Sequence, residues 1–371
     1  MNALDTDVVV IGGGAMGSSA AWNLARRGRE VTLLERFAPG HRNGASHGAS
    51  RNFNLAYAEP AHVAMLLESQ LEWRELEAET GTAILDQVGL VDHGRNPGHD
   101  HVHAALAAAG IPSEFLPPEE AGRRWPGLRF TTRALHLPTA GRLNADAAVR
   151  AFQSAAAARG ADVRHETPVR SIRVLDDERV QVESDRGTIT ARRAVVAVGG
   201  WTSKLLGGLV ALPRLVVTQE QPAHFAVRDD TITWPGFNHH PGADDDWWYS
   251  GTYGMLTPGE GVKAGWHGVG PVVDPDRRDY EAEPVQFAAL RRYAREWLPG
   301  VDADLATPIS CTYTTTPDST FVLDASGPIT VGAGFSGHGF KFTPAVGRIL
   351  ADLADGRPSP GVFRLGRFTT A

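Results

Sequence analysis

The 371-residue sequence contains a single cysteine, Cys311, which excludes an internal disulfide and a cysteine-based metal cluster. Positive charge is also scarce, since 36 Lys and Arg against 43 Asp and Glu give a net charge of -7. The basic residues form no block, and phosphate binding needs clustered Lys and Arg, so we expect no nucleic-acid partner. No apolar run approaches the roughly 18 residues that a membrane-spanning helix needs.

The N-terminus also lacks the basic region, apolar core and cleavage site of a secretory signal. Its first apolar run, Val8–Ile11, leads directly into a turn. We therefore expect a cytoplasmic protein that binds no membrane. Hydrophobic residues make up 42% of the chain and charged residues 21%, which indicates a folded globular protein, and the length suggests two domains.

The first 35 residues have the pattern of a complete βαβ unit. Asp7–Ile11 is a buried strand, Gly12–Gly17 a tight turn, and Ala15–Arg27 a helix with apolar residues at helical spacing. Gly28 is placed to end that helix, and Val31–Glu35 is the second strand. This arrangement predicts a parallel sheet at the N-terminus.

The turn satisfies the Gly-x-Gly-x-x-Gly pattern through Gly12, Gly14 and Gly17. The first glycine permits the tight turn, the second lets a pyrophosphate approach the backbone, and the third lets the helix pack on the strand. Glu35 lies at the end of the second strand, where its carboxylate can accept hydrogen bonds from ribose hydroxyls. The pattern predicts a dinucleotide site without separating FAD from NAD, and Glu35 argues against a 2′-phosphate.

The rest of the chain alternates between helical and strand-like segments. Ala61–Thr80 reads as a long amphipathic helix with Val63, Leu66, Leu67, Leu71 and Trp73 on or near one face. Ala145–Arg159 is a second, Ala-rich helix. A small β-meander and further short elements follow, at Asp162–Arg164, Val169–Leu175, Val180–Ser184, Thr188–Thr190, Ala194–Val198 and Ile329–Val331, with a last helix at Pro344–Leu353.

The simplest architecture is an α/β protein with a Rossmann-type nucleotide-binding domain and a second, substrate-binding domain built on an antiparallel sheet. The nucleotide-binding domain is predicted to be discontinuous, and residues 1–83, 145–214 and 308–371 form it. Residues 84–144 and 215–307 form the second domain.

Several motifs together make a family resemblance specific. They occur in the same order and at similar spacing as in monomeric sarcosine oxidase and N-methyltryptophan oxidase, members of the D-amino-acid-oxidase-like flavoprotein superfamily. The resemblance selects FAD as the cofactor and implies the FAD fold of that superfamily. The matching segments are Asn43–Arg51, Arg124–Gly127, Ala197–Leu206, Val262–His267, Cys311–Asp318 and Gly334–Phe342.

The resemblance implies roles for residues around the flavin ring. Cys311 matches the cysteine that forms an 8α-S-cysteinyl thioether with FAD in that family, although the residues alone favour an inert buried thiol. His47 and Arg51 match residues near the ring that assist attachment. Lys263 matches the lysine that activates O2, because a nearby cation stabilises developing superoxide. By itself, a lone lysine would more often be solvated.

Lys341 matches a lysine that pairs with the substrate carboxylate, and its alternative is an ordinary surface-reaching lysine. Tyr313 and His267 match residues that line the substrate cavity, although Tyr313 could equally pack in the core. The resemblance and the turn together predict cofactor contacts at Gly12, Gly14, Ala15, Met16, Gly17, Glu35, Arg36, His47, Ser50, Arg51, Val169, Gly200, Cys311, Gly337, Gly339 and Lys341.

The sequence departs from the family at the substrate end. The relatives have a second arginine three residues after the match to Arg51, and here Asn54 occupies that position. An asparagine supplies no charge, so the bidentate clamp for a carboxylate is lost. The relatives' active-site tyrosine has no clear match, and Tyr249 or Ser250 is expected in its place. The acidic triplet Asp244–Asp246 is expected to be a solvated loop.

These departures predict that sarcosine is not the substrate. Five aromatic residues could line a larger cavity or could simply pack the sheet: Phe53, Trp247, Trp248, Tyr249 and Trp266.

We therefore expect an FAD-dependent amine oxidase that oxidises a C–N bond of a secondary or N-methylated amine to an imine, with O2 reduced to H2O2. Its expected partners are a small-molecule amine and O2, and it would be a monomer or small homo-oligomer. The nearest alternative is a biosynthetic flavin enzyme that oxidises a cyclic imino acid of the pipecolate or piperideine type. A flavin-binding protein without turnover and a flavin monooxygenase are further alternatives, the latter disfavoured by Lys263.

Overall fold

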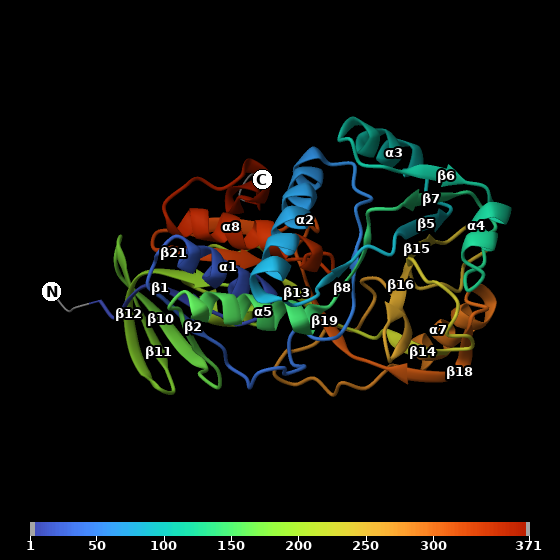
Figure 1. Cartoon of the computed structure of the whole chain (residues 1–371). Coiled ribbons are helices and arrows are strands. Elements are labelled where there is room, and N and C mark those ends of the chain that lie inside the picture. Colours follow the sequence, from blue (N-terminus) through green and yellow to red (C-terminus); the bar gives the residue numbers. More distant parts are fainter. Residues whose placement is uncertain (1–3, 369–371) are drawn as a thin grey trace.

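The computed structural model describes residues 4–368. Two bodies, each built around a large sheet, lie side by side with helix α2 (Pro60–Thr80) near their junction (Figure 1). The N-terminal body holds the first strands and the C-terminal helix, and the other holds residues from the middle of the chain. The α/β fold class predicted from the sequence is confirmed, whereas the residue bounds of the two domains remain a prediction.

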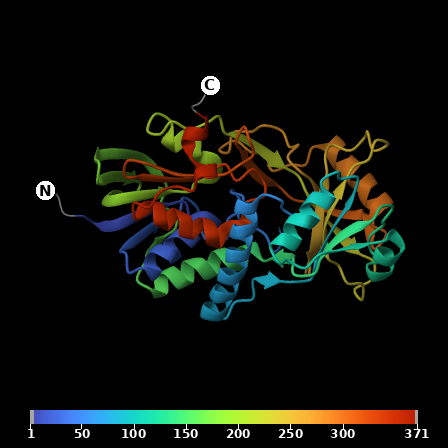
Figure 2. The ribbon, with the colours of Figure 1, turned by 90° about the horizontal axis from the view of Figure 1, so that it is seen from above.

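The first sheet has a parallel core in the order β21, β12, β1, β2 and β9. Helices α1, α5 and α8 pack against one another, and Figures 1 and 2 show them on one face of this sheet. Gly28 follows α1 with φ +75° and its N–H donates to the carbonyl of Ala25, as expected of a helix end. These elements span β1 Thr6–Ile11, α1 Ala15–Arg26, β2 Val31–Leu34, α5 Ala145–Ala158, β9 Asp162–Arg164, β12 Gly187–Val196, β21 Ile329–Ala333 and α8 Thr343–Ala354.

The β-meander differs from the prediction. Strands β10 (Val169–Asp176) and β11 (Arg179–Ser184) form antiparallel pairs with each other and with β12. Residues 188–190 and 194–196, predicted as separate strands, both belong to the one long strand β12. Asp162–Arg164 is not in the meander but pairs in parallel with β2, and β20 (Val322–Ser326) was not predicted. Residues 187–191 of β12 thus pair antiparallel with β11, and residues 191–196 of the same strand pair in parallel with β1.

The second sheet has eight strands in the order β18, β14, β17, β16, β15, β5, β7 and β6. It is antiparallel as predicted except at one pair, because β15 and β5 run in parallel. Helix α7 packs against β17 and β18, and the core contains Trp125, Trp234 and Tyr293. The elements are β5 Leu90–Gly94, α3 His99–Ala108, β6 Glu114–Leu116, α4 Pro118–Arg124, β7 Ala134–Leu137, β14 Ala223–Val227, β15 Gly236–His240, β16 Thr252–Thr257, β17 Gly261–Trp266, α7 Pro284–Trp297 and β18 Val301–Pro308.

Two small sheets lie outside the large ones. Strand β13 (Val216–Glu220) pairs with β19 (Cys311–Thr315), so the chain's only cysteine begins a two-stranded ribbon. Strand β8 (Gly141–Leu143) pairs with both β3 (Arg51–Phe53) and β4 (Leu85–Asp86). Arg51 and Cys311, which start β3 and β19, thereby approach each other although 260 positions separate them.

Helix α2 begins one residue earlier than predicted, and three residues of its predicted apolar face, Val63, Leu66 and Trp73, are buried. Leu67 and Leu71, expected on the apolar face, are 38% and 69% exposed. The buried positions instead follow a spacing of three or four residues through Val63, Leu66, Ser69, Trp73 and Leu76, and the helix packs on α5 and α8. Within residues 4–368, no helix is both long and apolar enough to cross a membrane.

Candidate active site

The glycine-rich turn between β1 and α1 is shaped by close backbone approaches. Gly12 has φ +102°, and a Cβ added there would lie 2.5 Å from the carbonyl oxygen of Ala197. A Cβ on Gly17 would lie 1.9 Å from the oxygen of Gly12, so the helix can pack on the turn only with glycine at this position. Gly14 differs, because its Cβ would meet only the Ser46 side chain, and it lines a cavity. The open side of the turn therefore faces this cavity.

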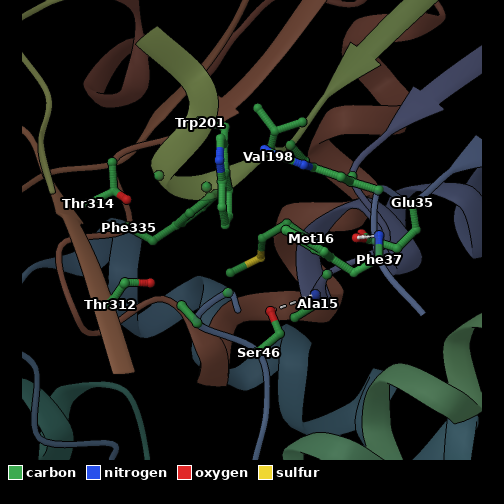
Figure 3. A pocket seen from close by; sticks show the side chains of 18 of the residues that line it. Ala15, Met16, Glu35, Phe37, Ser46, Val198, Trp201, Thr312, Thr314 and Phe335 are labelled. Atoms are coloured by element: carbon green, nitrogen blue, oxygen red, sulfur yellow. Dashed lines mark hydrogen bonds between the residues drawn. The ribbon is translucent and has the colours of Figure 1, made fainter. Parts of the chain in front are cut away.

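The N-terminus of α1 offers backbone donors without a competing acid, since its first turn has no acidic residue. The N–H of Ala15 donates to Ser46 Oγ at 3.0 Å, a contact drawn in Figure 3. Sequence reasoning missed Ser46, which lies within the matched segment Asn43–Arg51 but outside the glycine pattern. An anion at this end of the cavity would face the positive end of the helix dipole.

Glu35 closes the same end of the cavity. Its two carboxylate oxygens accept from the N–H of Gly13 at 2.7 Å and of Phe37 at 2.9 Å. Burial alone would raise the pKa of Glu35, but hydrogen bonds from His41 and from these backbone groups outweigh it and lower the pKa. The side chain is therefore an anion at neutral pH. Its Oε1 contacts both Phe37 and His41, whereas Oε2 accepts from Gly13 and keeps a second lone pair for a hydroxyl donor.

A cavity of about 380 Å³ extends from this turn to Cys311 and Tyr313. Figure 3 shows Met16 in its wall and Trp201, Val198 and Phe335 around it. Sequence reasoning missed Trp201, Phe335 and Phe340, which only the folded chain brings to this cavity. The predicted residues that line it are Gly12, Gly14, Ala15, Met16, Glu35, Arg36, Arg51, Val169, Gly200, Cys311, Tyr313, Gly337 and Gly339.

The other predicted residues are not among those lining this cavity. They are Gly17, His47, Ser50, Asn54, Lys263, His267 and Lys341. Gly17 packs inside the turn.

Arg51 organises the residues around Cys311. Its guanidinium donates to the backbone oxygens of Ala45, His47 and Ser50, and one nitrogen lies 3.8 Å from Cys311 Sγ. Burial, followed by the charge of Arg51, lowers the pKa of His47 to about 3, so that imidazole is neutral. Its Nε2 is buried without a hydrogen-bond partner. The Arg51 cation therefore lies close to the sulfur.

Lys263 is buried on β17, where it is 3% exposed. Its Nζ donates to the backbone oxygen of Ser50, which connects it to the Arg51 segment. Burial, and then the positive charge of Arg51, holds the pKa of Lys263 well below its usual range. An anion formed beside Lys263 would reverse this effect and favour the ammonium form.

Three aromatic rings meet at the start of β19. Tyr313 Oη lies 3.4 Å from His267 Nδ1, and Tyr253 hydrogen-bonds to Tyr313. A Cβ on Gly337 would lie 2.2 Å from the Tyr313 ring, so the glycine lets the Gly334–Phe342 segment reach that ring. Burial lowers the pKa of His267 and raises that of Tyr313, so both side chains are neutral at pH 7.

The position expected for the active-site tyrosine is wrong. Tyr249 is 40% exposed, and Ser250 Oγ accepts from the backbone N–H of His267. Tyr253 on β16 is the residue that meets Tyr313 and His267. The loop between β15 and β16 takes up the extra residues, so β16 begins later than the motif spacing suggests.

Lys341 lies in a single 3₁₀ turn, Phe340–Phe342, just before α8. Its Nζ donates to Tyr57 Oη at 3.0 Å and to the His338 carbonyl at 2.8 Å. Burial lowers the pKa of Lys341 to about 7. No signal in the sequence singled out Tyr57, which follows β3. Within residues 4–368, no acidic side chain forms a hydrogen bond or ion pair with the Lys341 ammonium, so it can receive an anion.

Asn54 does not replace the missing arginine. Its Oδ1 accepts from the N–H of Ala56 at 2.8 Å, which folds the side chain onto its own backbone. The guanidinium of Arg51 is occupied by backbone carbonyls.

Three of the five aromatic residues that could line a larger cavity or pack the sheet lie in cores, whereas Trp247 is partly buried and Tyr249 is 40% exposed. Trp248 and Trp266 are 8% and 4% exposed and belong to the core of the second sheet. Their ring centroids lie 5.9 Å apart. Phe53 is fully buried in the core of the first body. Of the acidic triplet, Asp244 and Asp246 are exposed, which agrees with a solvated loop.

Comparison with known proteins places the chain among flavoenzymes. The family model described as FAD dependent oxidoreductase matches residues 7–353. Monomeric sarcosine oxidase of Bacillus sp. (strain NS-129) is 35% identical, over 94% of this chain and 92% of the relative. N-methyl-L-tryptophan oxidase of Yersinia pestis is 28% identical, over 98% and 100%. The solved structure of NikD, an unusual amino acid oxidase essential for nikkomycin biosynthesis, has a TM-score of 0.84 at 28% identity, covering 97% of this chain and 98% of NikD.

Proposed function

Because the chain belongs to the FAD dependent oxidoreductase family, we propose that it is an amine oxidase acting on a secondary or N-methylated amine other than sarcosine. The observation that carries the proposal is a pair of buried lysines beside residues of the cavity. Lys263 donates to Ser50, the neighbour of the cavity residue Arg51, and Lys341 follows the cavity residue Phe340. Enzymes described as sarcosine, N-methyltryptophan and amino acid oxidases among the relatives support the reaction class.

The reaction balances without a further reactant. The amine loses two electrons and two protons to become an imine, and O2 gains the same number to become H2O2. Water then hydrolyses the imine. FAD, when bound, supplies the group that accepts the electrons and passes them to O2. The turn at Gly12–Gly17 and Glu35 would hold the ADP half of FAD. The flavin ring would be surrounded by Arg51, Lys263, Cys311, Tyr313 and Lys341.

Lys263 is proposed to stabilise the negative charge that develops on O2. Its ammonium is disfavoured in the resting protein by burial and by Arg51. The ammonium form of Lys263 is therefore favoured most when an anion forms beside it. As a result, Lys263 stabilises negatively charged, reduced O2 more than it stabilises neutral O2. This difference is what accelerates a reaction rather than binding alone.

Cys311 is proposed to carry the flavin through a thioether. Attachment replaces an S–H and a C–H bond by the C–S bond, and the two electrons and two protons released would reduce O2 to H2O2. Arg51, 3.8 Å from the sulfur, is placed to stabilise a thiolate during attachment. Acid precipitation tests this link, since the pellet should stay yellow for the wild type and turn colourless for Cys311→Ser. Free flavin in the supernatant of the wild type would overturn it.

The substrate proposal rests on one cation where the relatives are expected to have two. Lys341 is available to an anion, whereas Asn54 is tied to Ala56 and Arg51 to carbonyls. Loss of one charged hydrogen bond weakens carboxylate binding by about 1.5–3 kcal/mol. Substrate affinity should then depend more on contacts with Tyr57, Tyr253 and Tyr313. Sarcosine is too small to make all of these contacts.

A second candidate is a biosynthetic oxidase or dehydrogenase of a cyclic imino acid. The likeness to NikD, whose description places it in nikkomycin biosynthesis, favours it. Product mass separates the two candidates. An acyclic amine yields hydrolysed fragments, whereas a cyclic one yields a dehydrogenated ring that has lost two hydrogens and remains intact.

The direct test is anaerobic bleaching of the flavin by a panel of N-methyl amino acids, cyclic imino acids and carboxylate-free amines. We expect at least one to bleach it and air to restore it with one H2O2 per amine oxidised. A flavin that no amine bleaches would contradict the proposal and indicate a binding protein without turnover.

A further inference from the structure

A second cluster of polar side chains lies in the other body, away from the cavity. Asp92 on β5, His99 at the start of α3 and His240 at the end of β15 meet there. None of the three is among the residues lining the cavity. The proposed reaction gives this cluster no role.

The donor atoms of the cluster converge on one point. Asp92 Oδ1 lies 2.9 Å from His99 Nε2 and 2.7 Å from His240 Nε2, and the three atoms lie within 4.8 Å of one another. Asp92 and His99 are buried, with side chains 8% and 4% exposed, whereas the side chain of His240 is 34% exposed. A small ion could therefore enter from the solvent beside His240.

The backbone holds two of these residues in fixed positions. Strands β5 and β15 pair in parallel, with Asp92 opposite Asn238 and Gly94 opposite His240. A Cβ on Gly94, where φ is +91°, would lie 2.1 Å from the His240 carbonyl oxygen, so only glycine permits this close approach. The third ligand, His99, is at the first residue of a ten-residue helix. The site is thus preorganised by regular secondary structure.

We propose that Asp92, His99 and His240 bind a divalent transition-metal ion, for which Zn²⁺ is the best match. Two imidazole nitrogens and one carboxylate oxygen are a set that zinc accepts, with metal–ligand distances of about 2.0–2.2 Å. Tetrahedral geometry at those lengths separates the donors by roughly 3.3 Å, so the present separations need to widen by about half an ångström. A water molecule entering beside the partly exposed His240 would complete the coordination.

The ion would have a structural role. It would join β5, β15 and the start of α3, three segments that are up to 148 positions apart in the sequence. It would also fix the end of β15, from which the loop carrying Trp247 and Trp248 departs. Because the ion would bind the folded state alone, it would raise the free energy of unfolding by an amount that grows with the logarithm of the ratio of free Zn²⁺ to its Kd.

The test uses tag-free flavin-loaded enzyme that has been dialysed against EDTA and then titrated calorimetrically with ZnCl2. We expect one Zn²⁺ per chain and a higher unfolding temperature. His240→Ala and Asp92→Asn should weaken binding at least about 10–100-fold. The matched control is His103→Ala, because His103 is on the same helix but bonds to Ser113 outside the cluster, and it should bind like the wild type.

Three results would overturn the site. They are the lack of saturable one-to-one binding in the wild type, equal affinity in His240→Ala, and an equal loss of affinity in His103→Ala. Because His240 is partly exposed, its alanine variant should fold even if Asp92→Asn does not. Co²⁺ provides a second readout, since ligation by the cluster should give visible bands at longer wavelength than the flavin, and these should vanish in His240→Ala.

Discussion

The two ends of the cavity are built by different means. The end at Gly12–Gly17 depends on backbone shape within a short stretch of sequence, where a single added Cβ would collide with a carbonyl at 1.9 or 2.5 Å. The end at Cys311 depends on side chains from β3, β16, β17, β19 and the turn before α8. The first end can recognise only what all dinucleotides share, whereas the second can change its substrate by changing one residue, such as Asn54.

The comparison predicts that a change in the turn removes the cofactor altogether. Gly17→Ala should cost about 3 kcal/mol or more in stability, because the nearest atom in the clash is the backbone oxygen of Gly12, which no side-chain rotation can move away. We expect an apoprotein with a lower melting temperature, measured by the ratio of flavin to protein absorbance. Gly122→Ala, in helix α4 with no atom within 4 Å of the new Cβ, is the control and should keep full flavin content.

A change at the end of the cavity near Cys311, called the ring end below, should leave the flavin bound but slow one half-reaction. Lys263→Met should reduce the rate of reoxidation by O2 about 100–1,000-fold, the scale of losing one preorganised electrostatic group. Stopped-flow mixing of reduced enzyme with O2 measures this rate, and anaerobic reduction by the amine should change little. Reoxidation within a few-fold of the wild-type rate would contradict the role of Lys263.

Lys341→Met should affect the other half-reaction and only some substrates. For an amine with a carboxylate, we expect KM to rise about 10–100-fold, whereas a carboxylate-free amine should be unaffected. The pKa of Lys341 is about 7, so the ammonium is lost as pH rises through that value. In the wild type, KM for the carboxylate substrate relative to the carboxylate-free one should therefore rise above pH 7. A pH dependence that persists in Lys341→Met would exclude this lysine as its source.

The smallest expected effect separates two neighbouring tyrosines. Tyr253→Phe removes the hydroxyl that contacts Tyr313 and should lower kcat/KM by about 2–10-fold, the range that one hydrogen bond of about 0.5–1.5 kcal/mol gives. Tyr249→Phe, at an exposed position, should leave kcat/KM unchanged. Equal effects in steady-state kinetics would mean that the structure assigns the wrong tyrosine to the site.

The same contrast explains what the sequence could predict. The first βαβ unit and its turn were readable because strand, turn and helix follow one another within 35 residues. The parallel pairing of Asp162–Arg164 with β2 was not readable, since the partner lies about 130 positions away. On α2, Leu67 and Leu71 are apolar but lie outside the stripe that α5 and α8 cover, and composition alone does not identify that stripe.

At the ring end, motif matching supplied most residues but not their orientation. The motifs included Arg51 and Lys341, yet only the fold shows that Arg51 donates to carbonyls and that Lys341 rests on Tyr57. Tyr253 was not predicted as a site residue. The prediction counted positions back from the motif that contains Lys263, and such counting does not show where the loop after β15 ends. Asn54 was recognised as a departure, but its hydrogen bond to Ala56 depends on local backbone geometry.

The most direct test of the account is the rate of H2O2 release from sarcosine compared with larger N-methylated and cyclic amines. The account predicts that a larger amine has the higher kcat/KM, and that Asn54→Arg shifts the ratio towards sarcosine. If sarcosine is the best substrate of the wild-type enzyme, the reading of Asn54 and Lys341 is wrong.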